Sequence, residues 1–539
     1  MTDDALLDTP APEPISASAW SAALAGTIGA AVALGTGQLV SGLLDVTPSP
    51  VLAVGGEFVD RFAASLKELA VSLFGTNDKA ALVIGTVIFS LVLGALVGIG
   101  ARRQRWLPVV VLGAFGVVGA LAQITDPRHV GPVAWLIALV SVGAGVGATW
   151  FLLDRARAVA VAKASPSDPA GPAGSEVGAP TPSVAVARRT FIGAAAALGA
   201  VSAATAAFGR SLVQQDVVGE AARRFRLRPP KSRVEVPASQ PFTVDGASPY
   251  ITPTEDFYRI DTALSAPQVD AGSWSLRIDG MVDEPFEISY QELLDLPSVE
   301  VPVTIQCVSN EVGGDLVGTA VWQGVPLADL LERAGVQSGA EQVFTHSVDG
   351  WTAGFPTEAV DGERVAILAY AMNGEPLTVP HGFPARLVVA GLYGYVSATK
   401  WIERIELTTW DGVDGYWVPR GWSKEGPIKL ASRIDVPRSG ERMPAGGVTL
   451  GGVAWRPSVG VRSVEVSVDD GAWQEAELGT VSSENTWVTW RLATDLGPGK
   501  HQARVRAIDA DGRTQTAAVA APAPNGATGL HQVSFEVAS

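Results

Sequence analysis

Long apolar runs dominate the first part of the chain. Five stretches of 19 to 25 residues carry no charged side chain. A helix needs about 20 apolar residues to cross a bilayer, and only a helix satisfies the backbone hydrogen bonds of such a run in hydrocarbon. The pattern therefore predicts five membrane-spanning helices, over residues 20–44, 80–100, 107–125, 134–153 and 190–209.

The first four helices predict an all-α transmembrane bundle over residues 20–153, preceded by an N-terminal tail of residues 1–19. Charged residues interrupt the apolar pattern near 51–74, which is typical of an amphipathic helix that lies at the membrane interface or caps the bundle. Residues 154–189 include a stretch rich in Ala, Pro, Ser and Gly, and they predict a flexible cytoplasmic linker.

Basic residues in the short loops predict how the bundle is oriented. Three arginines lie between the second and third runs, and five Lys or Arg residues lie between the fourth and fifth. Both loops are then cytoplasmic, which places everything after Gly209 outside. Six further basic residues follow on the predicted outer side, but long folded domains cross largely regardless of such charges. The expected localisation is the cell membrane, multi-pass, with an extracytoplasmic second part.

The fifth run begins with a pair of arginines, Arg188 and Arg189. Such a pair resembles a twin-arginine export signal placed inside the chain, and it equally suits a fifth span with a positive cytoplasmic flank. An export signal of that kind carries folded cargo. Both interpretations of residues 190–209 stay open, and so does cleavage after this span.

From about residue 241 the pattern changes to short alternating runs separated by Gly, Pro and Asp. Residues 274–278 alternate at the period of a strand, whereas 290–296 and 326–335 predict short amphipathic helices. Residues 365–370 and 386–389 predict buried strands. Residues 241–424 therefore predict an α+β domain.

A second change occurs near residue 425. Short strands are predicted over 464–468, 487–492 and 503–508, with turns at Asp469-Asp470-Gly471 and Asp511-Gly512. This spacing predicts an all-β immunoglobulin-like sandwich over residues 425–539. Because the chain has one cysteine, the sandwich cannot contain the disulfide of antibody domains.

Composition supports a hybrid of membrane and globular parts, with 47% hydrophobic and 17% charged residues. A net charge of −16 argues against a nucleic-acid partner. His129 is the one histidine in the four-span region, so a haem with two histidine ligands cannot be built there. No haem is expected in this chain.

The single cysteine, Cys307, follows an apolar run and precedes the glycines Gly313 and Gly314. A lone cysteine is more often a small buried hydrophobe. A thiolate at the end of a strand is also a strong ligand for soft or high-valent metals.

Several motifs follow one another along the chain before and after Cys307, in a part of the sequence that runs from residue 257 to 539. They are Phe257-Tyr258-Arg259, Gln306-Cys307-Val308-Ser309-Asn310, Met372-Asn373-Gly374-Glu375-Pro376-Leu377, His381-Gly382-Phe383-Pro384-Ala385-Arg386, Gly391-Leu392-Tyr393-Gly394-Tyr395 and Thr399-Lys400-Trp401. Together they resemble the sulfite oxidase family of molybdopterin-dependent oxidoreductases, here in a membrane-anchored bacterial form. The C-terminal sandwich resembles the dimerisation domain of that family, which implies a homodimer through this domain.

The resemblance implies a role for each matching residue. Cys307 would be the metal ligand and, with Arg259 and Trp351, would act in catalysis. The cofactor Mo-molybdopterin would be bound by Phe257, Tyr258, Arg259, Asn310, Asp349, His381, Arg386, Ser397, Thr399 and Lys400. An arginine can bind a phosphate with two parallel hydrogen bonds, and a lysine adds a point charge.

The family activity is oxygen-atom transfer at a molybdenum centre, with a small-molecule oxo donor or acceptor and a separate electron partner, either a cytochrome or quinone-linked. Two departures concern the substrate: Glu311 and Val312 stand where sulfite oxidases carry basic residues, and Trp351 replaces the active-site tyrosine. A reductase of S-oxides or N-oxides is therefore an alternative. A non-catalytic cell-surface binding protein is another.

Overall fold

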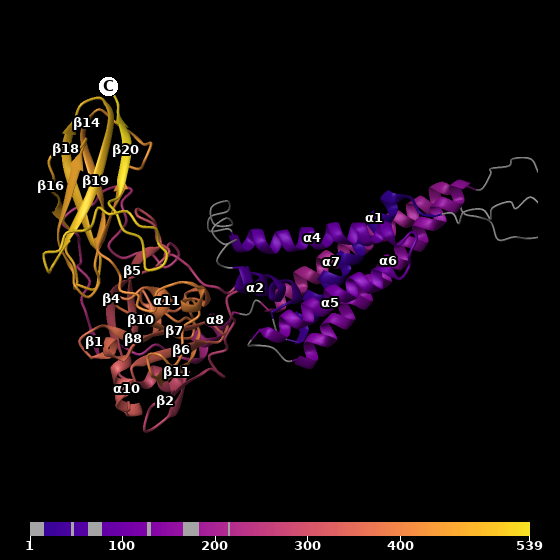
Figure 1. The fold of residues 1–539 in the computed structure, drawn as a ribbon, viewed down its shortest axis with the longest axis horizontal. Helices are drawn as coiled ribbons and strands as arrows, with labels where there is room; N and C mark the ends of the chain where they lie inside the picture. The colour runs from indigo at the N-terminus through magenta and orange to yellow at the C-terminus, as the bar shows by residue number, and fades with distance from the viewer. Residues whose placement is uncertain (1–15, 45–47, 63–77, 127–130, 165–182, 214–215) are drawn as a thin grey trace, which may run out of the picture. The chain divides into compact units, whose positions relative to one another are not determined.

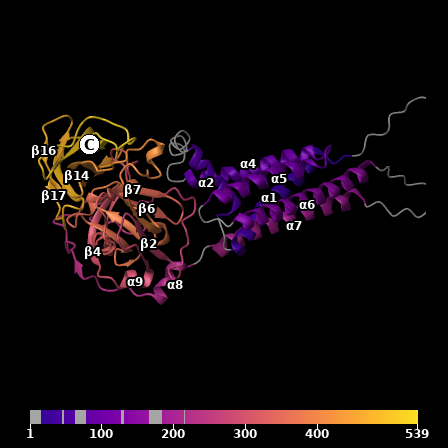
Figure 2. The same ribbon diagram turned by 60° about the horizontal axis from the view of Figure 1, so that its bottom comes forward.

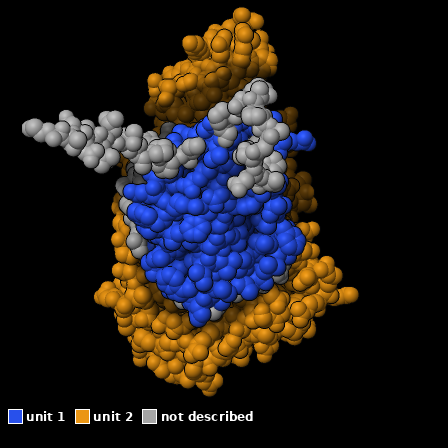
Figure 3. Space-filling view, turned by 90° about the vertical axis from the view of Figure 1, so that its right-hand side faces the viewer, with its two compact units in different colours: residues 1–215 blue, residues 216–539 orange. Residues whose placement is uncertain are grey.

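The computed structural model describes residues 16–44, 48–62, 78–126, 131–164, 183–213 and 216–539. The chain divides into two compact units, Met1–Gln215 and Asp216–Ser539, which Figure 3 draws in different colours.

The first unit is helical. Its helices are α1 (Ala19–Leu44), α2 (Pro50–Phe62), α4 (Asp78–Gly100), α5 (Leu107–Thr125), α6 (Gly131–Ala164) and α7 (Val184–Val213). Helix α1 packs against α4, α6 and α7 (Figure 1). Among the described residues, five helices are long and apolar enough to cross a membrane by length and composition, and they contain the five predicted apolar runs.

Two helices extend into the predicted linker of residues 154–189. Helix α6 continues to Ala164 and α7 already begins at Val184, while residues 165–182 lie outside the described residues. The apolar run ends at the charged residue Asp154, but the following Arg- and Ala-rich stretch has a high helix propensity. In the predicted amphipathic segment, α2 ends at Phe62, and residues 63–74 are not described.

Close contact between helices in this unit depends on glycine. A Cβ atom added to Gly26 of α1 would lie 2.0 Å from the carbonyl oxygen of Gly94 on α4 and 2.7 Å from the nitrogen of Gly98. On another side of α1, a Cβ on Gly42 would lie 2.4 Å from the carbonyl oxygen of Gly209 on α7. Small residues allow such backbone approaches between apolar helices.

The second unit begins with helix α8 (Val217–Arg224) and contains two sheets in its first part (Figures 1 and 2). One sheet has the order β1-β4-β5-β8-β10, with β9 paired to β8. The other has the order β3-β2-β11-β6-β7. Their strands are β1 (Ser232–Arg233), β2 (Ser275–Gly280), β3 (Phe286–Ser289), β4 (Val299–Gln306), β5 (Val317–Pro326), β6 (Gln342–Ser347), β7 (Thr352–Pro356), β8 (Ala366–Met372), β9 (Glu375–Pro376), β10 (Arg386–Val389) and β11 (Ile402–Thr408).

Three short α-helices accompany these sheets, namely α9 (Tyr290–Asp295), α10 (Leu327–Ala334) and α11 (Gly394–Ser397). Helix α9 begins with a capping box, in which the Ser289 hydroxyl accepts the Glu292 N–H and the Glu292 carboxylate accepts the Ser289 N–H. Helix α10 ends at Gly335, whose φ of 66° lies in the left-handed region. The predicted α+β character of this region agrees with these elements.

The last part of the chain forms two more sheets, ordered β12-β14-β18-β17 and β13-β20-β19-β15-β16. A shared core draws Val448 and Leu450 from the first sheet and Val466, Val505 and Phe535 from the second. The strands are β12 (Ala431–Val436), β13 (Arg442–Met443), β14 (Gly446–Trp455), β15 (Val461–Val468), β16 (Gln474–Glu475), β17 (Glu477–Leu478), β18 (Val488–Leu496), β19 (Gly499–Asp509) and β20 (Gln532–Val537).

The bounds of the second unit differ from those predicted. The unit starts at Asp216 rather than at residue 241, and β1 pairs in parallel with β4. The β-rich part is not a separate compact unit, because Trp455 and Trp487 are buried in the same core as the first two sheets. Strand pattern alone could not reveal that these two tryptophans join the core of the first two sheets, while the C-terminal sheets also keep a core of their own.

We predict that Gly26→Ala destabilises the helical unit. The added methyl group would collide with the backbone of α4, and overpacking of this kind costs about 1–3 kcal/mol. Thermal unfolding of the full chain in detergent micelles measures the effect. Gly113→Ala on α5 is the control, because a Cβ there meets nothing within 4 Å. Equal melting temperatures for the two variants would contradict the predicted packing.

Candidate active site

Cys307 lies at the end of β4 and is buried, with 9% of its surface exposed. Its N–H donates to the carbonyl oxygen of Leu316 at 2.9 Å. The side-chain oxygen of Asn310 accepts the Leu316 N–H, also at 2.9 Å. These two hydrogen bonds close the loop after the cysteine, so Asn310 acts through the shape of this loop.

The C-terminal sheets hold the end of β4 from outside its own sheet. The Thr304 N–H donates to the Asn485 carbonyl oxygen at 2.9 Å, and the Thr304 hydroxyl accepts the Trp487 N–H at 2.7 Å. Two residues further on, the indole N–H of Trp455 donates to the Gln306 side-chain oxygen at 2.8 Å. Sequence reasoning missed these contacts, and the available signal was weak: a buried tryptophan needs an acceptor for its N–H.

The same sheets also support the loop that follows Cys307. Arg433 of β12 donates to the carbonyl oxygen of Gly314 at 2.7 Å and pairs with Asp435 at 2.6 Å. Gly313 has a φ of 82°, and a Cβ on it would lie 2.2 Å from the His531 ring. The position therefore requires glycine both for its backbone and for its space.

Two tyrosines lie close enough to Cys307 to sense its charge. Burial is the main cause that raises the pKa of Tyr258, and the charge of Cys307 raises it further while that of Arg386 lowers it. Burial also raises the pKa of Tyr393 to about 12, with a further contribution from Cys307. Tyr258 is therefore within electrostatic range of both Cys307 and the Arg386 guanidinium.

Aromatic rings build the wall behind Tyr258. Phe257 stacks on Tyr258 with ring centroids 5.2 Å apart, and it meets Trp322 edge to face at 5.7 Å. The His381 ring lies edge to face with Phe257 at 5.8 Å. Phe257 thus contacts the rings of both Tyr258 and His381.

His381 is held neutral by its surroundings. Its Nε2 atom lies 3.0 Å from the carbonyl oxygen of Thr254, which therefore accepts a hydrogen bond from the Nε2–H. Burial and then the charge of Arg386 lower the pKa of His381 to about 4. A neutral ring beside a buried cation avoids a repulsion that protonation would create.

Three cations gather next to these rings with little opposite charge. The Arg386 guanidinium, in a residue that is 5% exposed, contacts the carbonyl oxygens of Leu387, His381 and Ala398 at 3.3 to 3.5 Å. Lys400 and Arg259 both pair with Asp261, at 2.9 and 3.0 Å. Asp261 thus pairs with two of the three cations, and within residues 216–539 the structure pairs Arg386 with no carboxylate.

Burial lowers the pKa values of two of these cations. Loss of hydration lowers the pKa of Arg386 to about 10, and it lowers the pKa of Lys400 to about 8 in spite of Asp261. Each shift expresses the free-energy cost of an incompletely compensated buried charge. The site is therefore prepared for an anion.

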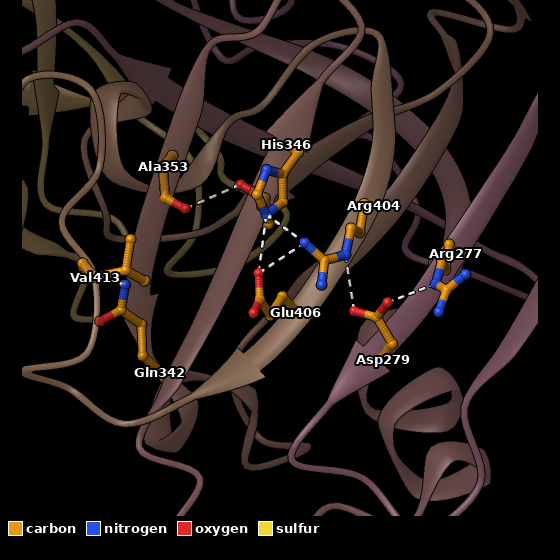
Figure 4. Close-up of polar contacts among 9 residues, drawn as sticks. Arg277, Asp279, Gln342, His346, Ala353, Arg404, Glu406 and Val413 are labelled. Carbon is orange, nitrogen blue, oxygen red and sulfur yellow. Dashed lines mark hydrogen bonds and ion pairs between the residues drawn. The ribbon is translucent and has the colours of Figure 1, made fainter.

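A second charged cluster, on the other sheet, is balanced by comparison. Asp279 of β2 lies between Arg277 and Arg404, at 2.5 and 2.8 Å (Figure 4). Arg404 also pairs with Glu406 at 2.9 Å, and His346 lies 3.1 Å from the same carboxylate. Two carboxylates match two guanidinium groups, so this cluster has the character of a structural network between β2, β11 and β6.

Comparison with known proteins agrees with this site. Residues 263–417 match the family described as oxidoreductase molybdopterin binding domain. An uncharacterized oxidoreductase of Bacillus subtilis, YuiH, is 38% identical over 157 residues, which are 29% of this chain and 76% of the relative. The chain belongs to the sulfite oxidase family of molybdopterin oxidoreductases. It is an enzyme of that family, and its cofactor is molybdopterin.

Further relatives share this part of the chain. Human mitochondrial sulfite oxidase is 30% identical over 48% of this chain and 56% of its own length, so this chain spans about half of that protein. The crystal structure of the sulfane dehydrogenase SoxCD from Paracoccus pantotrophus is similar with a TM-score of 0.46 and 23% identity, covering 53% of this chain and 81% of the other.

The residues at the site fit the cofactor of a sulfite oxidase family enzyme. Gly382 has a φ of 106°, and a Cβ on it would lie 3.0 Å from the Lys400 Cβ and 3.1 Å from the Arg386 Cβ. The backbone of Gly382 therefore packs closely against the first side-chain atoms of Lys400 and Arg386, two buried cations that suit the phosphate of a pterin. A single thiol at the end of β4 suits molybdenum, because thiolates bind soft and high-valent metals.

Four other predicted residues take part less directly. Asp349 and Trp351 lie in the turn between β6 and β7, where the Asp349 carboxylate accepts the Trp351 N–H at 3.1 Å. The Ser397 hydroxyl donates to the Tyr393 carbonyl oxygen, and the Thr399 hydroxyl shares a hydrogen bond with Thr345 at 2.6 Å. These side chains are engaged within the protein, so Ser397 and Thr399 have mainly backbone groups to offer a ligand.

We predict that Arg386→Met lowers cofactor content without destabilising the cofactor-free protein. Removing a buried guanidinium that has no carboxylate partner removes a desolvation cost. Molybdenum per chain should fall at least about tenfold, while protein made in cells unable to synthesise molybdopterin should unfold at the same or a higher denaturant concentration. The control is Arg404→Met, which alters the balanced cluster and should leave molybdenum content unchanged. Equal cofactor loss in both variants would contradict a specific role for Arg386.

We predict a loss of stability in acid that depends on His381. Its pKa is about 4 in the folded protein and 6.5 when unperturbed, so between these values the unfolded chain binds a proton that the folded chain does not. The free energy of unfolding should therefore decrease as the pH falls from 6.5 to 4, by about 3 kcal/mol. Denaturant unfolding of wild type and His381→Gln across this range measures the difference. Identical pH dependence in the two proteins would show that His381 contributes nothing.

Proposed function

We propose that this chain is a membrane-anchored molybdenum enzyme that transfers oxygen atoms on the extracytoplasmic side. The observation that carries the proposal is the buried Arg386 guanidinium, which contacts the carbonyl oxygens of His381 and Ala398 but no carboxylate within residues 216–539, in the same unit as the single thiol, Cys307. Tyr258 lies within electrostatic range of both groups, which supports a metal ligand and an anion site in one region of the second unit. When bound, the molybdenum–pterin group supplies two-electron oxygen-atom transfer to or from a substrate.

Different residues of the chain would bind the cofactor and shape the site around it. The Cys307 thiolate would be the protein ligand of the metal, and the hydrogen bonds on Thr304 and Gln306 keep its strand in place. Arg386, Lys400 and Arg259 would bind the anionic end of the pterin. Trp351 and Asp349, in the turn before β7, stay predicted contributors to the pocket.

The membrane part of the proposal rests on exposed apolar side chains. On α4, Ile84, Ile88, Val92 and Leu96 follow one another at intervals of four residues and are 55–60% exposed. Such a face is unfavourable in water and favourable in lipid. With the basic loops in the cytoplasm, the second unit would be extracytoplasmic. Its two C-terminal sheets would form an immunoglobulin-like sandwich through which the enzyme dimerises.

The loop after Cys307 favours a neutral substrate as the second candidate. Glu311 and Asp315 are exposed there, on either side of Val312, Gly313 and Gly314. The nearby cation Arg433 is already paired with Asp435. Negative charge at the mouth of a site disfavours a dianion such as sulfite. Reduction of an S-oxide or N-oxide is therefore the alternative to sulfite oxidation, with electrons from a separate cytochrome or quinone-linked partner.

We predict that Cys307→Ser abolishes turnover while the second unit still folds. A serine hydroxyl stays protonated at neutral pH and is a much poorer ligand than a thiolate, so activity should fall more than about a hundredfold. Molybdenum content by elemental analysis and denaturant unfolding are measured on the same samples. A serine variant that keeps its metal and its activity would rule out the ligand role.

The direction of the reaction is tested on the wild-type enzyme. One assay offers sulfite with ferricyanide as electron acceptor, and the other offers methyl phenyl sulfoxide with reduced methyl viologen as donor. The acidic loop leads us to expect the higher kcat/KM in the sulfoxide assay. A reversed ratio would favour sulfite oxidation, and Cys307→Ser serves as the blank in both assays.

A further inference from the structure

The connection between β19 and β20 contains an uncharged segment, residues 514–530, that leaves apolar side chains in solvent. All six residues from 516 to 521 are exposed, and five of them are Ala or Val. Val519 is 89% exposed, more than any other large hydrophobic side chain among residues 216–539. Single exposed apolar residues are ordinary, whereas a run of them marks a surface that another molecule covers.

Hydrogen bonds give this segment a defined shape. Ala520 and Thr528 exchange both backbone hydrogen bonds, at 3.0 and 3.1 Å, and the Thr528 hydroxyl donates to the Ala518 carbonyl oxygen at 2.7 Å. The side-chain amide of the buried Gln515 donates to the Gly529 carbonyl oxygen at 2.9 Å. The exposure of Val519 is therefore a property of a hydrogen-bonded hairpin.

The segment meets the loop that follows Cys307. A Cβ on Gly529 would lie 3.5 Å from a methyl group of Val312 and 3.6 Å from a methyl group of Val519. Val312 is 36% exposed, and it belongs to the loop that the hydrogen bond between Cys307 and Leu316 closes. Two exposed valines from distant parts of the chain thus lie beside the same glycine.

The segment also meets a tyrosine near the thiol. A Cβ on Gly526 would collide with the Tyr393 hydroxyl. The Lys429 ammonium group donates to the side-chain oxygen of Asn525 at 3.1 Å and to the Gly526 carbonyl oxygen at 2.7 Å. Tyr393 is within electrostatic range of Cys307. At two points, therefore, the segment contacts the surroundings of the candidate site.

These contacts select the character of a substrate. The methyl groups of Val312 and Val519 are covered favourably by an apolar part of a ligand. Residues 514–530 offer no positive charge, and the exposed carboxylates of Glu311 and Asp315 flank Val312, so an anionic group would be repelled. A neutral compound with an aryl or alkyl group next to its oxo group meets both conditions.

We infer that Val312 and Val519 are specificity residues, which bind the apolar substituent of a neutral organic S-oxide or N-oxide. The inference rests on the proposed function, because it names the substrate class of the same site. Both valines would contact the substrate away from the oxygen atom that is transferred. They therefore determine which substrate is preferred.

The test compares methyl phenyl sulfoxide with dimethyl sulfoxide as substrates of the full-length enzyme in detergent micelles. Each sulfoxide takes two electrons from two molecules of reduced methyl viologen and two protons, and yields the sulfide and water. We expect a higher kcat/KM for the phenyl compound. Val519→Ser and Val312→Ser should each lower the ratio of the two kcat/KM values about tenfold, whereas Val519→Ile should keep it.

Val234→Ser is the matched control. Val234 is 37% exposed, and its N–H donates to the carbonyl oxygen of Glu300, seven residues before Cys307 on β4. The substitution removes a valine of similar exposure at about 23 Å along the strand, so the ratio should stay at its wild-type value. An unchanged ratio in both Val519→Ser and Val312→Ser would overturn the inference.

Two further measurements separate the other outcomes. If Val519→Ser changes the oligomeric state in sedimentation but not the ratio, a second copy of the chain covers the segment and the inference is wrong. If a molybdenum-loaded wild type reduces neither sulfoxide, the proposed reduction fails, and binding of methyl phenyl sulfide by saturation-transfer NMR decides the inference. Weaker binding in Val519→Ser would support it, and equal binding would overturn it.

Discussion

The end of β4 is held from two sides, and the position of Cys307 depends on that. Val303 and Ile305 point into the core of the first two sheets, whereas Thr304 and Gln306 on the opposite face are hydrogen-bonded by the C-terminal sheets. Successive side chains of a strand alternate between faces, so a slip by one residue would exchange apolar and polar positions. The register of β4 is therefore fixed, and with it the residue at its end.

The cations around Arg386 show that this part of the chain is not arranged for its own stability. Burying charge without a counter-charge opposes folding, and the surrounding core, with Trp322, Tyr370 and Phe383 fully buried, offsets that cost. The balanced cluster around Asp279 demonstrates that the same chain can pair its arginines where no ligand is required (Figure 4). The contrast separates a binding site from a structural network more clearly than charge counts alone.

The sequence predicts elements better than it predicts their association. Apolar length located the five long helices, and the alternation of residues 464–468 located part of β15, because both signals come from local burial. Helix ends were misplaced where Arg- and Ala-rich segments continue a helix beyond its apolar run. The contacts of Trp455 and Trp487 with β4 could not be foreseen, because they join residues about 150 to 180 positions apart and no local pattern encodes them.

The candidate site residues also fall into two groups: those whose side chains gather in one buried region, and those whose side chains are engaged elsewhere in the protein. Motif order brought Tyr258, His381, Arg386 and Lys400 to attention, and the structure places them around one buried region. Asn310 and Thr399 are in the same motifs, yet their side chains are engaged in shaping the protein. A motif reports that a residue matters for a family. Only the contacts separate residues that face a ligand from residues that hold the backbone.

The candidate site can be understood through a group that the protein itself leaves incompletely satisfied. In the second unit such a group is a guanidinium that contacts carbonyl oxygens but no carboxylate. Buried polar groups are almost always paired in folded proteins, so such exceptions carry chemical information. A buried cation among carbonyl oxygens is stabilised by an anion, so the class of ligand follows from the charge that the site lacks.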